Sequence, residues 1–229
     1  MVSSVSPSND NNVQRMSSSW TRLVAEGCGS ALALLVLSPV LLLITFAVFV
    51  ETGWPILFSQ TRVGRDGKLF RLLKIRSMRA TTSGCSITAS SDPRITRVGR
   101  VLRKYKLDEL PQLWNVVCGQ MSLVGPRPEL PEFVDLRQPS WRSVLQVRPG
   151  ITDPVSIAYR NEEKLLASVE DPVRFYRETV LPDKLTRNLA YLGERSFWRD
   201  LEVILRTVGC AAFPENLDRK KGRILTPGD

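Results

Sequence analysis

The apolar positions of this chain are concentrated in one long segment near the N-terminus. Between Glu26 and Glu51 the sequence GCGSALALLVLSPVLLLITFAVFV carries no charged residue. At about 1.5 Å per residue, a helix of this length is long enough for the roughly 30 Å hydrocarbon core of a bilayer. We therefore predict a membrane-inserted helix over residues 20–50. The preceding residues 1–19 are rich in Ser, Asn and Asp, which predicts a disordered tail.

Ser38 and Pro39 interrupt the apolar segment at its middle. A proline inside a helix removes a backbone hydrogen bond and clashes with the carbonyl four residues earlier, here that of Leu35. In lipid such a break persists only if the freed groups find partners, and Ser38 is a candidate partner.

Cations flank the apolar segment on both sides, with Arg15 and Arg22 before it and Arg62, Arg65 and Lys68 after it. A simple spanning helix does not account for positive charge on both sides. Three placements remain open: a re-entrant helix bent at Ser38-Pro39, a kinked spanning helix, and a buried helix of a soluble protein. The flanking charges favour the re-entrant form.

The next segment has the pattern of a basic β-hairpin. Asp66-Gly67 separates two runs with apolar positions, and this dipeptide is a strong hairpin signal. Pro55 favours a sheet edge at the start of the first strand. Lys74 and Arg76 follow on the second strand, where a solvated basic face or contact with lipid headgroups is the plain alternative to a binding role.

Helical patterns dominate the remainder of the chain. One helix is predicted to begin near Thr96 and to pause before Pro111, followed by helices over residues 155–190. An amphipathic helix from Phe197 to Val208 either packs on the core or lies at a membrane interface. Residues 80–91 are predicted to form a flexible loop, and residues 214–229 a basic tail. The fold class is thus α+β, with a globular domain over residues 51–213.

The composition of the chain limits the classes of partner and catalytic site that it can have. The net charge of +9 predicts an anionic partner: nucleic acid, an acidic membrane surface or phosphorylated substrates. The chain has no histidine, which excludes Ser-His and Cys-His nucleophile pairs and histidine-containing zinc sites. Its four cysteines are widely separated and have the pattern of isolated thiols in a reducing compartment.

Two adjacent carboxylates, Asp108 and Glu109, follow a cluster of cations that includes Arg103 and Lys106. Nearby positive charge favours the ionised carboxylate, so we expect both pKa values to be lowered. Neighbours on a helix point about 100° apart, which gives the two carboxylates different targets on a phosphate-bearing substrate. Farther along, Arg127 lies between Pro126 and Pro128, in a rigid loop that can present its guanidinium to phosphate oxygens. A surface helix with ordinary charge pairs is the alternative.

These features together resemble the monotopic phosphoglycosyl transferases, also called the bacterial sugar transferase family. The resemblance covers residues 20–208. It rests on the Ser38-Pro39 segment and on four further stretches, QTRVGRDGKLFRLLKIRSMR, DPRITRVGRVLRKYKLDELPQLWNV, GQMSLVGPRPELPEF and VRPGIT. Each stretch alone is a weak signal, but the set in this order is specific.

The resemblance implies a re-entrant membrane helix and a monotopic enzyme on the cytoplasmic face of the bacterial inner membrane. It implies transfer of a phosphosugar from a UDP-sugar to polyprenyl phosphate, with release of UMP, as the priming step of polysaccharide or glycan assembly. By the same resemblance Asp108 is the nucleophile and Glu109 helps to hold Mg²⁺, while Arg103 and Arg127 contact phosphates. Lys74 and Arg76 match a basic element of the family that serves substrate binding.

The chain also departs from the family pattern. Lys106 stands where a small hydroxyl residue is expected, Ile75 replaces the commoner Phe, and an extra segment occupies roughly residues 167–188. The sugar, the pathway and the possibility of a homo-oligomer therefore stay open. The rival function is a membrane-tethered protein that binds anionic lipid or nucleic acid without catalysis. The cationic stretches lack a nucleic-acid-binding motif, so no nucleic-acid partner is expected.

Overall fold

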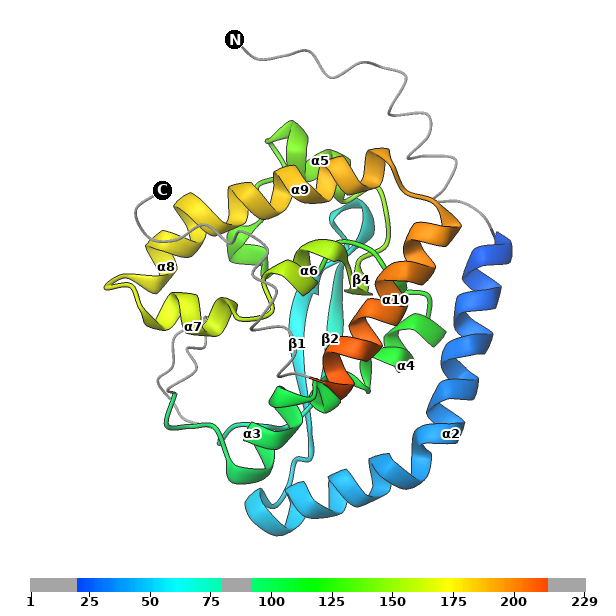
Figure 1. The fold of residues 1–229 in the computed structure, drawn as a ribbon, viewed down its shortest axis with the longest axis vertical. Helices are drawn as coiled ribbons and strands as arrows, with labels where there is room; N and C mark the ends of the chain where they lie inside the picture. The colour runs from blue at the N-terminus through cyan, green and yellow to red at the C-terminus, as the bar shows by residue number, and fades with distance from the viewer. Residues whose placement is uncertain (1–19, 80–91, 214–229) are drawn as a thin grey trace.

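The computed structural model describes residues 20–79 and 92–213. Its first element, α2 (Trp20–Thr52), is one helix of 33 residues that contains Pro39. It curves around the edge of the molecule and bends near its middle (Figure 1). Within the described residues it is the one helix long and apolar enough to cross a membrane. The predicted tails at residues 1–19 and 214–229 and the predicted loop at residues 80–91 lie outside the described residues.

The break at Pro39 is compensated as the sequence predicts. Pro39 has no N–H to give to the carbonyl of Leu35, and the Ser38 hydroxyl donates to that carbonyl over 2.7 Å. The helix therefore keeps this carbonyl satisfied although its backbone hydrogen bond is missing.

Both ends of α2 form hydrogen bonds with the same globular domain. Near the start, Glu26 accepts hydrogen bonds from Ser122 at 2.7 Å and from Arg148 at 2.9 Å. At the other end, the two oxygens of Glu51 accept from the backbone N–H groups of Arg97 at 2.7 Å and Val98 at 2.9 Å. Both ends of α2 therefore contact the same domain.

The apolar side chains in the middle of α2 are exposed. Leu35, Leu42, Leu43 and Phe46 each expose about 70% of their surface, with values between 67% and 72%. A helix from the core of a soluble protein buries its apolar residues, so this third placement is wrong.

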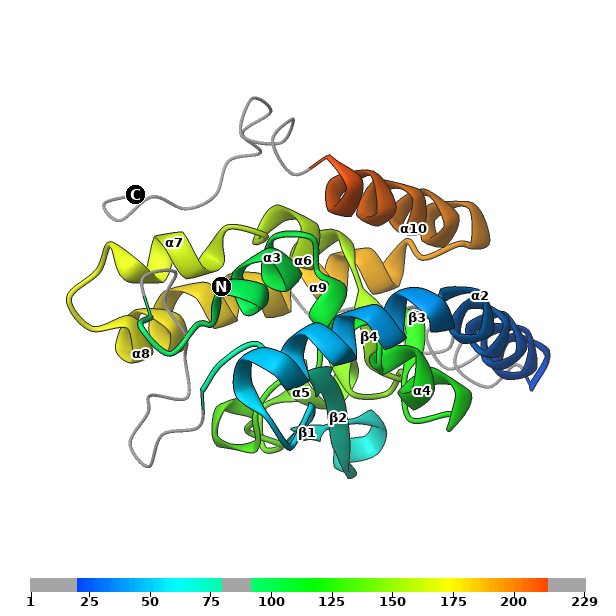
Figure 2. The same ribbon diagram turned by 90° about the horizontal axis from the view of Figure 1, so that it is seen from below.

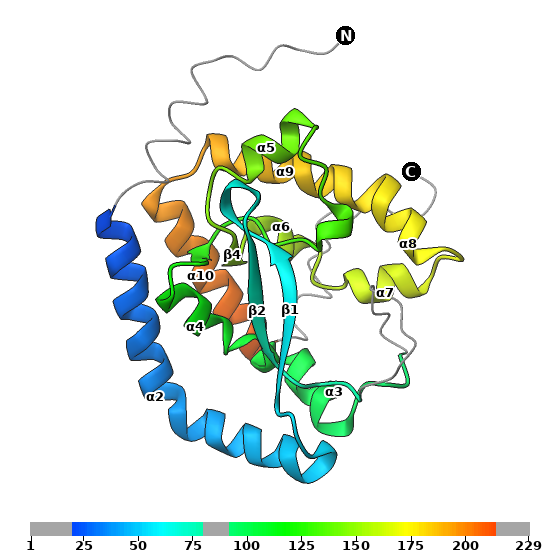
Figure 3. The ribbon, with the colours of Figure 1, turned by 180° about the vertical axis from the view of Figure 1, so that it is seen from behind.

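The predicted hairpin is present. Strands β1 (Leu57–Val63) and β2 (Leu69–Ile75) pair antiparallel, with Leu57 opposite Ile75 and Val63 opposite Leu69. Asp66 and Gly67 form the turn with φ values of 56° and 76°. Positive φ at both positions is what a tight hairpin turn requires, and Asp-Gly supplies it at little cost. The hairpin lies across the back of the domain (Figure 3).

Short helices and a second, two-stranded sheet make up the rest of the domain. β3 (Ser122–Val124) and β4 (Gly150–Thr152) run parallel. The three residues of β4 are too few for a strand pattern to show in the sequence. The helical elements are α3 (Arg97–Lys104), α4 (Gln112–Val117), α5 (Pro139–Val144), α6 (Pro154–Ala158), α7 (Glu162–Ala167), α8 (Pro172–Phe175), a π-helical turn (Tyr176–Val180), α9 (Leu181–Gly193) and α10 (Phe197–Ala212).

The main core lies between the hairpin end, the loop after β3 and the helices α5 to α9. Its buried side chains include Val63, Phe133, Trp141, Tyr159 and Tyr176. A separate cluster of Val48, Ile75 and Leu102 joins the C-terminal half of α2 to β2 and α3. The mixture of helices and two small sheets confirms the α+β fold class.

Helix α10 has an unusual orientation for an amphipathic helix. Val203 and Asp200 are buried, whereas Phe197, Trp198 and Leu205 are 71%, 74% and 64% exposed. The apolar face thus points away from the core. Figure 2 shows α10 on the side of the domain opposite the hairpin, with α2 passing between them in this view. Of the two roles that the sequence left open for this helix, the structure favours an interfacial one.

Candidate active site

Asp108 and Glu109, together called the dyad, lie on a short turn between α3 and α4. Helix α3 begins as predicted, with the Thr96 side chain accepting from the Gly99 N–H at 2.8 Å, but it ends at Lys104. Lys106 then adopts a left-handed conformation with φ 57°, and a 3₁₀ turn follows over Leu107–Glu109. A right-handed helix cannot continue through a left-handed residue, so the predicted single helix is wrong.

The break changes which residues share a face. Arg100 and Lys104 belong to α3, whereas Asp108 lies beyond the left-handed residue. These three side chains therefore do not share one helical face, although their spacing of four would align them on a continuous helix. The turn buries the dyad, because Asp108 is 5% and Glu109 is 8% exposed.

Glu109 is held by two cations from different parts of the chain. The Lys74 Nζ, from the end of β2, lies 3.0 Å from Glu109 Oε1. Arg127 donates to both oxygens, with its Nη1 3.2 Å from Oε2. Burial opposes ionisation of Glu109, but Arg127 and Lys74 hold the pKa of this carboxyl well below its usual range. The expected lowering is confirmed for Glu109.

Asp108 behaves in the opposite way. Its burial raises the pKa of the carboxyl, and this outweighs the attraction of Lys74 that lowers it. The expected lowering is therefore wrong for Asp108, because proximity of cations in the sequence says nothing about loss of water. Its Oδ1 atom is buried and has no hydrogen-bond partner among the described residues. A buried carboxylate oxygen without a partner is costly, which makes Asp108 a candidate functional residue.

The loop that carries Arg127 is fixed by close backbone contact. A Cβ added to Gly150 would lie 2.1 Å from the Gly125 nitrogen, so no side chain fits there. The Gly150 N–H donates to the Pro126 carbonyl at 3.0 Å. With Pro126 and Pro128 restricting the backbone on either side, Arg127 has little freedom, as the sequence predicts.

The other predicted residues separate into two groups. Arg103 pairs with Glu163, and its charge partly offsets the burial that raises the pKa of Asp108, so it belongs to the surroundings of the dyad. Arg76 instead donates to the backbone carbonyls of Trp54 at 3.3 Å and Met78 at 3.3 Å. The structure thus brings Asp108, Glu109, Lys74, Arg127 and Arg103 together, and directs Arg76 to the backbone beside the hairpin.

Sequence reasoning missed two ionisable residues near Arg127, one partly buried and one fully buried. Arg62, counted only as a cation that follows the apolar segment, is partly buried and donates to the Pro128 carbonyl at 3.1 Å. Asp153 is fully buried, and its Oδ1 accepts from the Val155 N–H at 2.8 Å at the start of α6. Asp153 before Pro154 is a helix-start signal that was available in the sequence. No local pattern distinguishes Arg62 from its exposed neighbours.

The dyad fits an open type of magnesium site. Mg²⁺ is usually bound by one or two carboxylates together with substrate phosphates, not by a cage of protein ligands. Within residues 20–79 and 92–213, no group of three or more His, Cys, Asp or Glu side chains forms such a cage. The unpartnered Oδ1 of Asp108 and the oxygens of Glu109, which retain further lone pairs, suit the open type.

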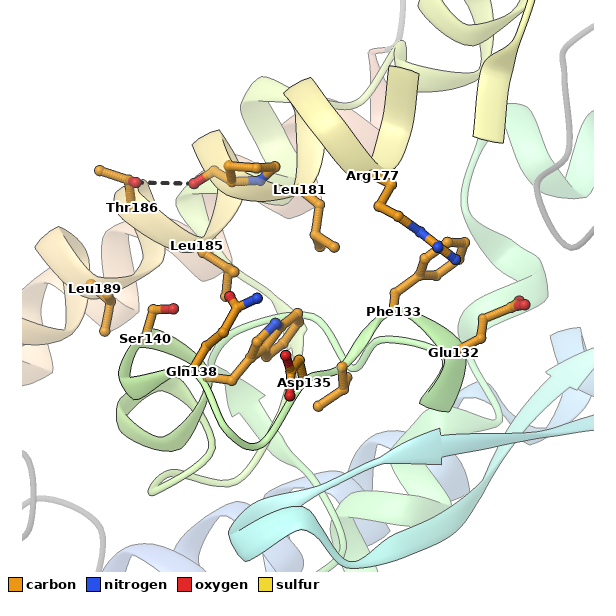
Figure 4. Close-up of a pocket in the computed structure, with 13 residues that line it drawn as sticks. Glu132, Phe133, Asp135, Gln138, Ser140, Arg177, Leu181, Leu185, Thr186 and Leu189 are labelled. Atoms are coloured by element: carbon orange, nitrogen blue, oxygen red, sulfur yellow. Dashed lines mark hydrogen bonds between the residues drawn. The ribbon is translucent and has the colours of Figure 1, made fainter. Parts of the chain in front are cut away.

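A groove of about 450 Å³ lies elsewhere, between α9 and the segment that leads into α5. Figure 4 shows Leu181 and Leu185 from α9 facing it, with Arg177 directed toward the Phe133 ring at its edge. None of the predicted site residues lines this groove.

Comparison with known proteins identifies the class. The model of the bacterial sugar transferase family matches residues 17–213. A UDP-glucose:undecaprenyl-phosphate glucose-1-phosphate transferase from Caulobacter vibrioides is 36% identical over 198 residues, which cover 84% of this chain and 70% of that protein. An Escherichia coli enzyme of the same description is 36% identical over 78% of this chain, but over only 37% of its own length. A UDP-N-acetylgalactosamine-undecaprenyl-phosphate N-acetylgalactosaminephosphotransferase from Aeromonas hydrophila is 33% identical over 78% of this chain and 40% of its own.

The fold and the buried dyad therefore belong to a transferase of phosphosugar groups. The chain is a member of the bacterial sugar transferase family. This membership confirms the predicted resemblance and decides against the alternative of a binding protein without catalysis. The relatives are described with different sugars, so their names do not identify the sugar used here.

Proposed function

We propose that this protein transfers a phosphosugar from a UDP-sugar to a polyprenyl phosphate such as undecaprenyl phosphate, releasing UMP. The names of the relatives support the classes of donor and acceptor. The observation that carries the proposal is the arrangement of the dyad: Glu109 is paired with Lys74 and Arg127, while Asp108 Oδ1 has no hydrogen-bond partner among the described residues. One carboxylate is fixed in place and the other is left available to react.

Asp108 is the nucleophile in this proposal. Its carboxylate oxygen attacks the sugar-bearing phosphorus, forming a P–O bond while the bond to the bridging oxygen breaks and UMP leaves. An oxygen of polyprenyl phosphate then attacks the same phosphorus, which releases the polyprenyl diphosphosugar and restores the carboxylate. The acceptor is already an anion, so the step needs no general base, in agreement with a chain that has no histidine.

The neighbouring cations neutralise the charge on the donor. Phosphoryl transfer depends mainly on positioning and on compensation of negative charge. Lys74, Arg127 and Arg103 surround the dyad and supply positive charge from three separate elements. Glu109 would hold Mg²⁺, which when bound supplies further charge to the diphosphate oxygens. Asp108 is 5% exposed, so little of its surface faces solvent in this conformation.

The placement of α2 supports a re-entrant, monotopic arrangement at the cytoplasmic face of the inner membrane. The two ends of the helix contact one globular domain through Glu26 and Glu51, and a single domain lies on one side of a membrane. The exposed apolar face of α10 would rest in the interface of the same leaflet. Single cysteines introduced at Thr21 and Trp54 in a cysteine-free background should both react with an impermeant reagent in inside-out vesicles. Reaction from opposite sides would mean a spanning helix.

The activity itself is tested with detergent-solubilised protein, Mg²⁺, polyprenyl phosphate and a panel of UDP-sugars. We expect UMP release with at least one donor, and its loss in Asp108→Asn with membrane association retained. Thr61→Ser on β1 is a matched surface control that should keep the activity. Full activity in Asp108→Asn would end the proposal.

A further inference from the structure

The extra segment that departs from the family pattern contributes a buried tyrosine to the surroundings of Arg127. Tyr176, at the start of the π-helical turn, is 5% exposed, and its hydroxyl donates to Glu129 Oε1 at 2.7 Å. Burial and the charge of Glu129 raise the pKa of Tyr176 far above its usual value. The hydroxyl is therefore a hydrogen-bond donor to Glu129 near neutral pH.

Glu129 connects this tyrosine to the loop of Arg127. It follows Arg127 by two residues, and its Oε2 lies 4.0 Å from Arg62 Nη1. The same Arg62 nitrogen donates to the carbonyl of Pro128, the residue between them, at 3.1 Å. The Glu129 carbonyl also accepts from the Val63 N–H at 3.0 Å, which anchors the loop to β1. The backbone after Arg127 is thus held by a side-chain network that ends at Tyr176.

A lysine keeps Tyr176 in position. The Lys184 Nζ of α9 lies 4.9 Å from the centre of the Tyr176 ring and 5.5 Å from that of Tyr159. It also pairs with Glu162 of α7 at 2.7 Å. The Tyr176 ring in addition packs edge-on against Phe133 at 5.1 Å. Cation–π and aromatic contacts of this kind hold ring orientation in a core.

We propose that Tyr176 and Glu129 are positioning residues for phosphosugar transfer. They fix the loop so that Arg127 stays on Glu109 and compensates charge at the dyad. The inference rests on the proposed function only in assigning Arg127 and Glu109 to the donor site. It gives the extra helical segment a role in the reaction. Among the described residues, no side chain of this segment forms a hydrogen bond or ion pair with Asp108 or Glu109.

Two matched variants test the proposal in the full-length protein. Tyr176→Phe removes the hydroxyl that reaches Glu129 but keeps the ring and its contacts. Tyr159→Phe removes an equally buried hydroxyl from the same helical region, where it donates to Asp183 at 2.6 Å. Both variants lose one hydrogen bond to a carboxylate, but only the first hydrogen bond leads to the loop of Arg127.

The measurements are kcat and KM for UMP release and hydrogen–deuterium exchange of peptides that contain Val63 and residues 125–130. We expect Tyr176→Phe to lower kcat by about tenfold, the order of one hydrogen bond to a charged group. KM for the donor should change little, because a misplaced Arg127 loses its effect mainly on charge that develops in the transition state. Exchange in the two peptides should rise. Tyr159→Phe should leave kcat, KM and both peptides unchanged.

Unchanged exchange in Tyr176→Phe, or an equal rise in Tyr159→Phe, would overturn the positioning role. So would an unchanged kcat in Tyr176→Phe. The exchange measurement needs no substrate. If the unmodified protein released no UMP with any donor, the proposed function would fail, and exchange at the loop would still decide whether Tyr176 positions it.

Discussion

Replacing Glu109 with Gln should destabilise the protein, because the substitution removes the charge that Lys74 and Arg127 face. Breaking a fully buried ion pair from one side costs roughly 3–5 kcal/mol. The side chains of Lys74 and Arg127 keep 22% and 32% exposure, so part of their charge stays solvated. We expect a loss of about 2–3 kcal/mol in the free energy of unfolding. For a chain of this size that lowers the Tm by about 4–12 °C.

The assay is thermal unfolding of the two proteins in the same detergent at several pH values, followed by intrinsic fluorescence. A carboxyl with a lowered pKa stabilises the folded state above its unfolded pKa, and this contribution disappears as the pH falls through the folded pKa. The Tm difference between wild type and Glu109→Gln should therefore be largest near neutral pH and should shrink on acidification.

Glu163→Gln is the matched control. Glu163 also pairs with an arginine, Arg103, but its side chain is 39% exposed. An exposed pair contributes about 0–1 kcal/mol, so the control should change the Tm by little. Equal Tm values for Glu109→Gln and Glu163→Gln would refute the conclusion that Glu109 is locked by its cations.

Four further predictions follow from the same structure. Asp108→Asn should raise the Tm near neutral pH and not in acid, because a raised pKa means that ionisation costs the folded state stability; a lowered Tm at neutral pH would contradict this. Gly150→Ala should abolish UMP release, since its Cβ would strike the Gly125 backbone; retained activity would show a looser loop. Lys106→Gly should raise the Tm, because glycine adopts a φ of 57° without strain. Ser38→Ala should lower folded yield in membranes more than Thr45→Ala, whose hydroxyl donates at 2.9 Å to a carbonyl in unbroken helix.

The parts of the fold that depend on a few consecutive residues were predictable. Asp66-Gly67 specifies the hairpin turn, Thr96 caps α3, and Ser38 supports the break at Pro39, because each acts on backbone within four residues. The same locality applies to Arg127, whose backbone the flanking prolines restrict.

The parts that depend on tertiary packing were not predictable. The end of α3 at Lys104 depends on a lysine that takes a left-handed conformation, for which the sequence offers no signal. The pKa of Asp108 depends on how much water packing removes, and no count of neighbouring cations gives that quantity. The outward apolar face of α10 likewise follows from Asp200 turning inward to pair with Arg22 and Arg195.

The positions of Arg62 and Tyr176 also could not be predicted from the sequence. Their interaction through Glu129 joins segments more than forty residues apart, since Tyr176 follows Glu129 by 47 positions. Local patterns place both residues in ordinary elements, a strand and a helix. Only the assembled fold shows that they meet beside the loop of Arg127.

The most direct test of the central claim is the intact mass of the protein after mixing with a UDP-sugar donor in the absence of polyprenyl phosphate. The account predicts a species heavier by one phosphosugar, which Asp108→Asn does not form and which disappears when polyprenyl phosphate is added. An unmodified mass under conditions in which the protein turns over donor and acceptor would contradict a covalent intermediate on Asp108.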